Sequence, residues 1–370
     1  EESVDTLLSL NRYRQTGRLK VLVATGCLAQ RYEQELLTEL PEVDLLLGVN
    51  QYERLPEALK AALAGKRASY CADDHHILTG ERVLTTPPYT AYVRIADGCD
   101  NRCAYCAIPL IRGPFRSRPV KDVLAEVESL AARGVKEHVL VAQDTSRFGM
   151  DTQGRSLLPE LLEQAAAVPG VEWLRVLYCY PDEVDGRLLD VMTARPNICR
   201  YIDLPLQHAD PDLLRRMNRR GSIDGVRAFL TRARGMGFTL RTTMIVGFPG
   251  ETEAQFQRLL DFVTEMRFDR LGAFSYSPEE DTPAALLPEQ VPEETKQRRL
   301  DRLMTLQQGI SMERNRLRVG RTERALVEEI RGDGVLVART AAEAPDSDGL
   351  LYLRGGKGAN PGDFVTARIT

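Results

Sequence analysis

The stretch GCDNRCAYCAIP at residues 98–109 places three of the chain's seven cysteines, Cys99, Cys103 and Cys106, within eight positions of one another. Three thiolates can ligate three irons of a cubic iron–sulfur cluster and leave the fourth iron open to another ligand. A structural zinc site would require a fourth Cys or His, and this stretch contains none. The spacing therefore favours an iron–sulfur cluster. A zinc site completed by a distant residue, or three buried cysteines packed as small hydrophobic side chains, are the alternatives.

The composition is that of a soluble globular protein, with 43% hydrophobic and 28% charged residues among 370. This length favours two or three domains. The net charge of -4 gives the whole chain no general attraction to nucleic acids or anionic membranes. The sequence shows neither a membrane-spanning run nor a signal peptide, so we expect a cytoplasmic protein without a membrane partner. Thiols stay reduced in that compartment, which again points to metal binding or catalysis.

Residues 89–317 alternate regularly between apolar strand-like runs and amphipathic helical patterns. This alternation predicts an α/β fold with a parallel sheet, and six units suggest a partial (β/α)6 barrel. The predicted strands are 90–96, 138–142, 173–179, 201–206, 239–246 and 270–276.

Every predicted strand is followed by residues that could contact a ligand. Because catalytic groups of parallel barrels collect at the carboxyl ends of the strands, these loops are expected to surround one mouth. In chain order they contain Cys99, Gln143 with Asp144, residues 178–181, Gln207 with His208, residues 247–251, and residues 276–279.

The segments before and after the predicted barrel have different secondary-structure patterns. Residues 1–66 alternate helix and strand and predict a partial α/β domain, and residues 67–88 are polar and predict a linker. Residues 288–317 predict a helix whose charges lie on a solvated face. Short strands separated by turns over 318–370 predict a small β-barrel.

The C-x3-C-x2-C motif, with Tyr105 before its last cysteine, resembles the signature of the radical S-adenosylmethionine (SAM) superfamily. A radical SAM barrel between an α/β domain and a TRAM-like β-barrel is similar to the layout of the methylthiotransferases. Within that family, the stretches YIDLPLQHAD (201–210), MNRRGS (217–222) and LRTTMIVGFPGETE (240–253) resemble the RimO branch. The resemblance covers essentially the whole chain.

The resemblance implies that Cys99, Cys103 and Cys106 ligate a 4Fe–4S cluster whose open iron binds SAM. Electron transfer from the cluster then cleaves SAM to a 5′-deoxyadenosyl radical. Gln143 and Asp144 would face the methionine part of SAM. The remaining residues implied at the SAM pocket are Tyr105, Gly247, Pro249, Gly250 and Glu251.

Other polar and sulfur-containing residues are open to simpler interpretations. Gln207 and His208 could contact substrate or SAM, or could close a buried hydrogen-bond network. Cys71, Cys179 and Cys199 have no partner spacing and are interpreted as core or surface thiols. The basic run Arg215, Arg216, Arg219 and Arg220 is interpreted as a solvated surface.

The resemblance also implies a second, auxiliary 4Fe–4S cluster held by three cysteines of the N-terminal domain. The stretch VATGCLAQRY (23–32) matches the third of these ligands and assigns it to Cys27. The chain opens on Glu1 without a methionine, downstream of the other two ligands, and stops at Thr370. We therefore expect a sequence truncated at both ends that holds the SAM-binding cluster but not the auxiliary one.

For function, the resemblance implies transfer of a methylthio group to the β-carbon of an aspartate in small-subunit ribosomal protein S-twelve, free or in the ribosome. The electron donor would be a protein such as a flavodoxin. A tRNA adenosine methylthiotransferase of the MiaB type is the alternative enzyme, and RNA contact through the TRAM-like domain is possible. From 322 to 370 there are six basic and eight acidic residues, which suits a basic protein partner better than RNA. A non-enzymatic zinc or RNA-binding module is the remaining alternative.

Overall fold

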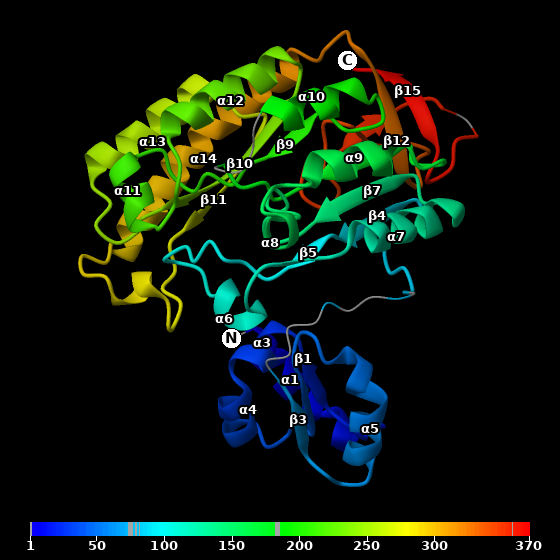
Figure 1. The fold of residues 1–370 in the computed structure, drawn as a ribbon, viewed down its shortest axis with the longest axis vertical. Coiled ribbons are helices and arrows are strands. Elements are labelled where there is room, and N and C mark those ends of the chain that lie inside the picture. Colours follow the sequence, from blue (N-terminus) through cyan, green and yellow to red (C-terminus); the bar gives the residue numbers. More distant parts are fainter. Residues whose placement is uncertain (1, 73–76, 78–79, 81, 182–185, 357) are drawn as a thin grey trace. The chain divides into compact units, whose positions relative to one another are not determined.

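The computed structural model describes residues 2–72, 77, 80, 82–181, 186–356 and 358–370 (Figure 1). It separates into two compact units. The first comprises the described residues of 1–81 with 98–100 and 107–116, and the second those of 82–97, 101–106 and 117–370.

The first unit contains a three-stranded parallel sheet in the order β1-β2-β3, which confirms the predicted α/β style of this part. The central strand β2 is buried along its whole length because helices and side chains cover both of its faces. The strands are β1 (Val23–Thr25), β2 (Leu45–Leu47) and β3 (Ala68–Tyr70). The helices are α1 (Glu2–Asn11), α2 (Tyr13–Thr16), α3 (Cys27–Arg31), α4 (Glu33–Glu39), η1 (Tyr52–Arg54), α5 (Leu55–Leu63) and α6 (Ile108–Arg112).

Strand β3 lies inside the segment predicted as a linker. Ala68 pairs with Leu45 and Tyr70 pairs with Leu47, so this sheet extends beyond residue 66. The strand has three residues between polar neighbours, and it depends on pairing with β2, which local sequence does not reveal. Residues 73–76, 78–79 and 81 of the predicted linker lie outside the described part of the chain. The domain limits remain predictions.

The second unit carries six parallel strands that follow one another in chain order. Hydrogen bonds form two groups, β4-β7-β8 and β9-β10-β11. The two groups adjoin, because the N–H of Cys199 donates to the carbonyl of Leu174 at 2.8 Å and the N–H of Cys179 to that of Asp203 at 3.0 Å. This order confirms the predicted (β/α)6 arrangement. The strands are β4 (Thr90–Arg94), β7 (Glu137–Val141), β8 (Trp173–Val176), β9 (Tyr201–Asp203), β10 (Thr239–Val246) and β11 (Arg270–Ser275).

Helices cover the outer face of these strands (Figure 1). Their apolar sides face the sheet because hydrophobic residues recur at helical spacing. They are α7 (Val120–Ala132), α9 (Leu158–Ala166), α10 (Gly186–Ala194), α12 (Ile223–Gly235), α13 (Glu253–Met266) and α14 (Glu293–Arg316). Shorter elements are β5 (Ala96–Asp97), β6 (Arg116–Ser117), α8 (Met150–Gln153), α11 (Pro211–Arg216) and η2 (Pro283–Leu286).

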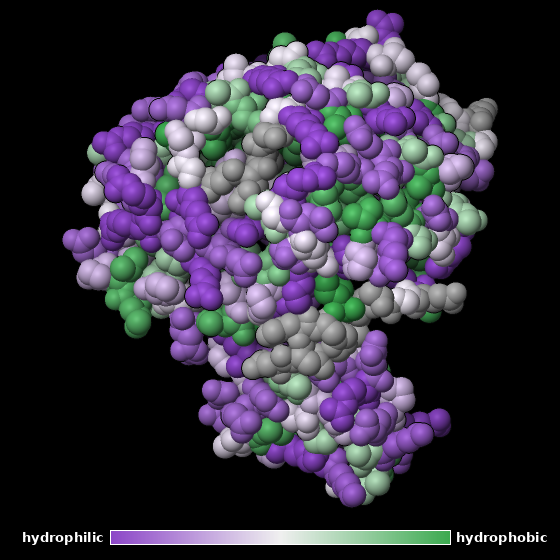
Figure 2. All heavy atoms as spheres, viewed as in Figure 1, coloured by the Kyte–Doolittle hydropathy of each residue, from purple (hydrophilic) through white to green (hydrophobic). Residues whose placement is uncertain are grey.

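The prediction that the charges of helix α14 lie on a solvated face holds for most of them, with two exceptions. Hydrophilic side chains do cover much of the neighbouring α12 and α13 surface (Figure 2). Lys296 and Arg299, however, are buried, because the helix packs against α13 and β11. Arg299 pairs with Glu251 at 2.9 Å, so its charge is compensated inside the protein.

The C-terminal segment of the second unit forms a four-stranded antiparallel sheet in the order β14-β13-β12-β15, as expected for the small β-domain. The strands are β12 (Thr322–Ile330), β13 (Leu336–Thr340), β14 (Leu351–Leu353) and β15 (Phe364–Arg368). The domain contacts the barrel through buried side chains, since Arg339 pairs with Glu137 of β7 at 2.6 Å. None of the helices within the described ranges is long and apolar enough to cross a bilayer.

Candidate functional site

The three clustered cysteines occupy the loop between β5 and α6. Cys103 is buried, whereas Cys99 and Cys106 are partly exposed. Cys99 belongs to the first unit and the other two belong to the second. Among the residues that the structure describes, no three His, Cys, Asp or Glu side chains are grouped in a way that could hold a metal ion. The cysteines share one short loop, and their role as cluster ligands stays a prediction.

Gly98 shapes the first part of this loop. Its φ of +75° is in the left-handed region, and an added Cβ would lie 2.1 Å from the carbonyl oxygen of Pro114. The N–H of Cys99 donates to the carbonyl of Gly113 at 3.1 Å. A glycine is therefore required directly before Cys99, because the backbone returns closely at this point.

Backbone hydrogen bonds hold the second part of the loop from two sides. The N–H of Ala104 donates to the carbonyl of Met217 at 2.9 Å, and its carbonyl accepts from the N–H of Ala284 at 2.8 Å. Asn218 donates through Nδ2 to the carbonyl of Arg102 at 2.8 Å. The residues around Cys103 are thus fixed by the segments after α11 and in η2.

Asp144 connects the loop to the carboxyl ends of β7 and β8. Its Oδ2 accepts from Asn101 Nδ2 at 2.8 Å, and its Oδ1 accepts from the hydroxyl of Ser146. The same hydroxyl accepts from the N–H of Tyr180 at 3.0 Å. Asp144 is completely buried, so these bonds give it a positioning role. Its predicted contact with SAM remains a prediction.

Two other strand ends carry buried polar atoms that lack a hydrogen-bond partner within the described part of the chain: Gln143 Oε1 after β7 and the hydroxyl of Tyr276 after β11. Burial also raises the pKa of Tyr276. An unpaired buried polar atom costs about 1–3 kcal/mol, so such atoms are rare unless a ligand completes them. Gln143 Oε1 and the Tyr276 hydroxyl are therefore candidates for contact with a polar ligand at this end of the barrel, and this stays a prediction.

The turn after β10 has Pro249 at its centre. The carboxylate of Glu251 in this turn is buried. Glu251 accepts from the N–H of Gly247, from Arg299 Nη1 at 2.9 Å and from His208 Nε2 at 3.1 Å. Gly247 and Gly250 both have φ of +73°. Glu251 therefore holds the shape of the turn, while contact between the turn and SAM is still a prediction.

His208 belongs to a buried hydrogen-bond network, the simpler of its two interpretations. Its Nδ1 accepts from the N–H of Asp210 at 3.0 Å, so the ring proton lies on Nε2 and is donated to Glu251. The ring is completely buried. Gln207 is partly exposed and has φ of +72°.

Arg219 is a functional candidate that the sequence interpretation missed. The basic run was interpreted as solvated, which holds for the exposed Arg215 and Arg220, but Arg219 is only 9% exposed. Its Nη1 lies 3.8 Å from Cys103 Sγ and its guanidinium stacks on the ring of Tyr180 at 3.9 Å. Burial together with the nearby Cys103 raises the pKa of Tyr105 in the same corner. In the sequence, Arg219 could have been singled out by its place in the MNRRGS stretch rather than by the positive charge of the run.

The remaining four cysteines lie in different environments, and the expected role of Cys27 as a cluster ligand stays a prediction. Cys27 is exposed at the start of α3, with Arg112 Nη2 at 3.8 Å from its sulfur. Burial raises the pKa of Cys179 to about 12 and that of Cys199 to about 11, as for core thiols. Cys71 is half-buried, and burial raises its pKa too.

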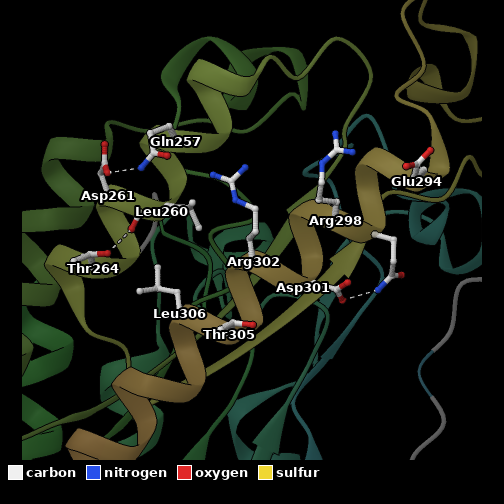
Figure 3. Close-up of a pocket in the computed structure, with 11 residues that line it drawn as sticks. Gln257, Leu260, Asp261, Thr264, Glu294, Arg298, Asp301, Arg302, Thr305 and Leu306 are labelled. Atoms are coloured by element: carbon white, nitrogen blue, oxygen red, sulfur yellow. Dashed lines mark hydrogen bonds between the residues drawn. The ribbon is translucent and has the colours of Figure 1, made fainter.

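A separate groove with a volume of ≈ 920 Å³ lies between α13 and α14 (Figure 3). Leu260 and Leu306 lie on one side of Arg302, and Arg298 lies on its other side. It contains none of the residues predicted to bind a cluster or SAM.

Comparison with known proteins agrees with this arrangement. The model of the radical SAM superfamily matches residues 93–263, and that of the TRAM domain matches residues 319–370. The ribosomal protein uS12 methylthiotransferase RimO of Desulforamulus reducens is 46% identical over all of this chain and 85% of its own length. That of Heliobacterium modesticaldum is 47% identical over all of this chain and 81% of its own length.

The fold is also similar to a solved structure. The radical S-adenosylmethionine methyltransferase TsrM from Kitasatospora setae matches with a TM-score of 0.57 at 17% identity, over 77% of this chain and 60% of that one. The whole-chain identity to the RimO enzymes is much higher. The chain therefore belongs to the RimO family of radical SAM methylthiotransferases.

Proposed function

We propose that this protein attaches a methylthio group to the β-carbon of an aspartate in ribosomal protein uS12. The observation that carries the proposal is the similarity to the RimO enzymes over the whole length of the chain. The clustered cysteines and the polar strand ends supply the groups that such a reaction needs.

Cys99, Cys103 and Cys106 would hold a 4Fe–4S cluster, and SAM would bind beside it. The ligands present fit a 4Fe–4S cluster with SAM on its open iron, because three soft thiol ligands share a loop with no fourth Cys or His. The unpaired Gln143 Oε1 and the Tyr276 hydroxyl are suited to the polar groups of SAM. When bound, the cluster and SAM supply the radical chemistry that removes hydrogen from an unactivated carbon.

The protein's own residues position these groups and exclude water. Asn101 and Asp144 fix the cysteine loop on the end of β7, and Arg219 lies against Cys103. A buried apolar cluster backs the loop and would keep water from a reactive centre. Its members are Ala104, Leu213, Met217, Phe248, Tyr276 and Ala284.

Further parts of the proposal concern the sulfur and the partners. Cys27 would be one ligand of an auxiliary 4Fe–4S cluster that carries the sulfur, with Arg112 beside it. One SAM molecule would supply the methyl group and a second the radical. A flavodoxin-type protein would deliver the electrons.

A tRNA adenosine substrate is the second candidate, favoured by the TRAM domain at residues 319–370. From 322 to 370, however, acidic residues outnumber basic ones by eight to six. This balance suits a basic protein partner better than an RNA.

The deciding experiment compares uS12 purified from cells that carry this gene with uS12 from cells in which the gene is deleted. We expect the intact mass of uS12 to rise by one methylthio group in place of one hydrogen, with the shift located on an aspartate. A uS12 variant with asparagine at that position should not be modified. If uS12 keeps its mass while tRNA nucleosides gain the group, the tRNA candidate replaces this proposal.

A further inference from the structure

Strand β11 lies at an edge of the barrel sheet, because it pairs with β10 on one side only (Figure 1). The N–H of Tyr276, directly after the strand, donates to the carbonyl of Val246 in β10 at 2.8 Å. Backbone groups point to alternate sides along a strand, so those of Leu271, Ala273 and Ser275 point away from β10. Within the described part of the chain, no residue outside β10 forms a hydrogen bond with the backbone of β11.

The edge strand β4 at the other end of the strand order is covered by its own chain. Its outward carbonyls, those of Thr90, Tyr92 and Arg94, each accept a hydrogen bond from a side chain. The donors are Thr86, Arg82 and Arg118. Natural edge strands are commonly protected by such cover or by charges, prolines and bulges. Residues 271–275 of β11 contain no charge, proline or bulge, so this edge is open to pairing with another strand.

Phe274 places an exposed aromatic ring on the open strand, with 63% of the residue accessible. It lies opposite Ile245 in the register with β10, so the two side chains share one face of the sheet. Ile245 packs against the buried cluster that contains Ala104 and Tyr276 and backs the cysteine loop. Phe274 therefore extends the apolar surface of the barrel mouth to the open edge, where an aromatic ring can anchor a protein partner.

The segment that begins with β11 is acidic. Residues 271–295 contain six carboxylates and neither Lys nor Arg. The carboxylates are Glu279, Glu280, Asp281, Glu289, Glu293 and Glu294. Residues 279–281, which follow the strand closely, are exposed. Because the whole chain has a net charge of only -4, this is a local concentration of negative charge. It attracts a basic protein and repels the phosphates of RNA.

We propose that an extended segment of the ribosomal protein substrate docks by adding a strand to the open edge of β11. The inference rests on the proposed function and deepens it, because it places the substrate chain on the barrel. Proteins that bind ribosomal RNA carry a surplus of Lys and Arg, which complements the acidic residues after β11. Backbone hydrogen bonds to Leu271, Ala273 and Ser275 supply affinity, and the ring of Phe274 adds a side-chain contact. Since β11 ends beside Tyr276, a segment paired along it brings one of its own side chains to the barrel mouth.

Amide hydrogen exchange of the full chain, with and without saturating purified uS12, tests the strand pairing. The amides of Leu271, Ala273 and Ser275 should exchange about tenfold more slowly or less in the complex, because uS12 supplies their acceptors. The amide of Tyr276 should change by less than about twofold, because it is already bonded to Val246. Protection that appears on the edge strand β14 instead, or unchanged exchange of β11 in the presence of uS12, would overturn the proposal.

Fluorescence anisotropy with labelled uS12 tests the same surface through variants. Ala273→Pro removes one outward N–H and leaves the bonds to β10 in place. Phe274→Thr removes the ring and keeps a residue suited to a strand. Each variant should weaken binding by about tenfold or more. The matched control Tyr352→Thr removes an aromatic residue with 61% exposure from the edge strand β14, and it should bind within about twofold of the unmodified protein.

A second pair of variants tests the charges. Glu280→Gln, Asp281→Asn should weaken binding at low salt and make it less dependent on salt. Asparagine tolerates the φ of +59° at Asp281, so the turn should keep its shape. The control Glu128→Gln, Glu163→Gln removes two exposed carboxylates on α7 and α9, and its binding should stay within about twofold. Equal losses in the two double variants would refute the role of the acidic segment.

The failure of this proposal and that of the proposed function are distinguishable. Unchanged uS12 binding in Ala273→Pro and Phe274→Thr, with the mass shift of uS12 in cells still present, would remove the docking site and leave the function. Absence of that mass shift would count against the function itself. Protection of β11 by an RNA of mixed sequence in place of uS12 would show that the edge serves another class of partner, and would also refute the docking proposal.

Discussion

At the scale of single residues, Cys103 differs from the core thiols in its surroundings. Arg219 Nη1 lies 3.8 Å from its sulfur, whereas Cys199 lies in the core, where burial raises its pKa to about 11. We predict that Cys103→Ala loses the iron and brown colour of the reconstituted protein, and that Cys199→Ala keeps both. Iron and sulfide analysis on anaerobic samples checks this. Equal iron in the two variants would remove Cys103 from the ligand set.

The buried side chain of His138 in β7 predicts how the stability of the protein depends on pH. Burial lowers the pKa of His138 from 6.5 to about 4, against the opposing influence of Val127 and Glu137. Between these two pH values the His138 ring is protonated in the unfolded chain but neutral in the native protein. The free energy of unfolding therefore falls as pH drops from 6.5 toward about 4. This shift contributes about 3 kcal/mol across that window.

Urea unfolding of His138→Leu measured across the same pH range tests this assignment. The variant should lose that part of the pH dependence, while the contribution of the carboxylates remains in both proteins. Identical pH dependence in the two proteins would show that His138 titrates normally in the native state.

Candidate ligands at a fixed local spacing are easier to predict from the sequence than the residues that support them. The three cysteines are recognisable because ligand spacing is local. Arg219 is 116 residues away from Cys103 in the chain, so the contact between them depends on the folded barrel. The inward orientation of Glu251 likewise depends on Arg299, which is 48 residues away.

At the scale of elements, the clearest local signals gave the most accurate boundaries. Strand β10 covers the predicted 239–246, because its alternating pattern matches a half-buried strand. Strand β9 was predicted to reach residue 206 but ends at Asp203. Pro205 follows and has no N–H to donate, which limits regular pairing. Helix α11 is a short helix of six residues, and it ends with Arg215 and Arg216 of the basic run.

Helix α13 begins directly after the Gly247–Glu251 turn and offers a prediction about its start. Thr252 and Gln255 form a capping box, with the Thr252 hydroxyl accepting from the N–H of Gln255 at 3.3 Å. Thr252→Ala should lower the free energy of unfolding by about 1 kcal/mol. The control Thr264→Ala removes an exposed hydroxyl on the same helix that bonds only to Leu260, and it should change stability by less than about 0.5 kcal/mol. Equal effects of the two substitutions in urea unfolding would contradict a specific role of the cap.

At the scale of the whole molecule, the barrel and the β-domain of the second unit share a buried ionic core. Glu137 of β7 accepts from Arg339 of β13 at 2.6 Å and from Arg175 of β8 at 3.1 Å. Although burial by itself would raise the pKa of Glu137, the two arginines hold it below its usual value. Arg339 is 202 residues away from Glu137 in the chain, so no local pattern predicts this contact.

This arrangement predicts that Glu137 couples the two parts into one folding unit. Glu137→Gln would leave the buried Arg175 without a carboxylate and Arg339 with Glu328 alone, and it should cost about 3–5 kcal/mol. The control Glu172→Gln removes an exposed pair with Arg324 between the same two parts, and it should cost less than about 1 kcal/mol. Trp173, the single tryptophan, packs edge-on against Phe364 of β15 at 4.8 Å, so its fluorescence reports on this interface. The fluorescence and circular dichroism transitions should coincide in the unmodified protein and separate in Glu137→Gln. Equal costs for the two glutamine variants would show that the buried carboxylate contributes no more than a surface pair.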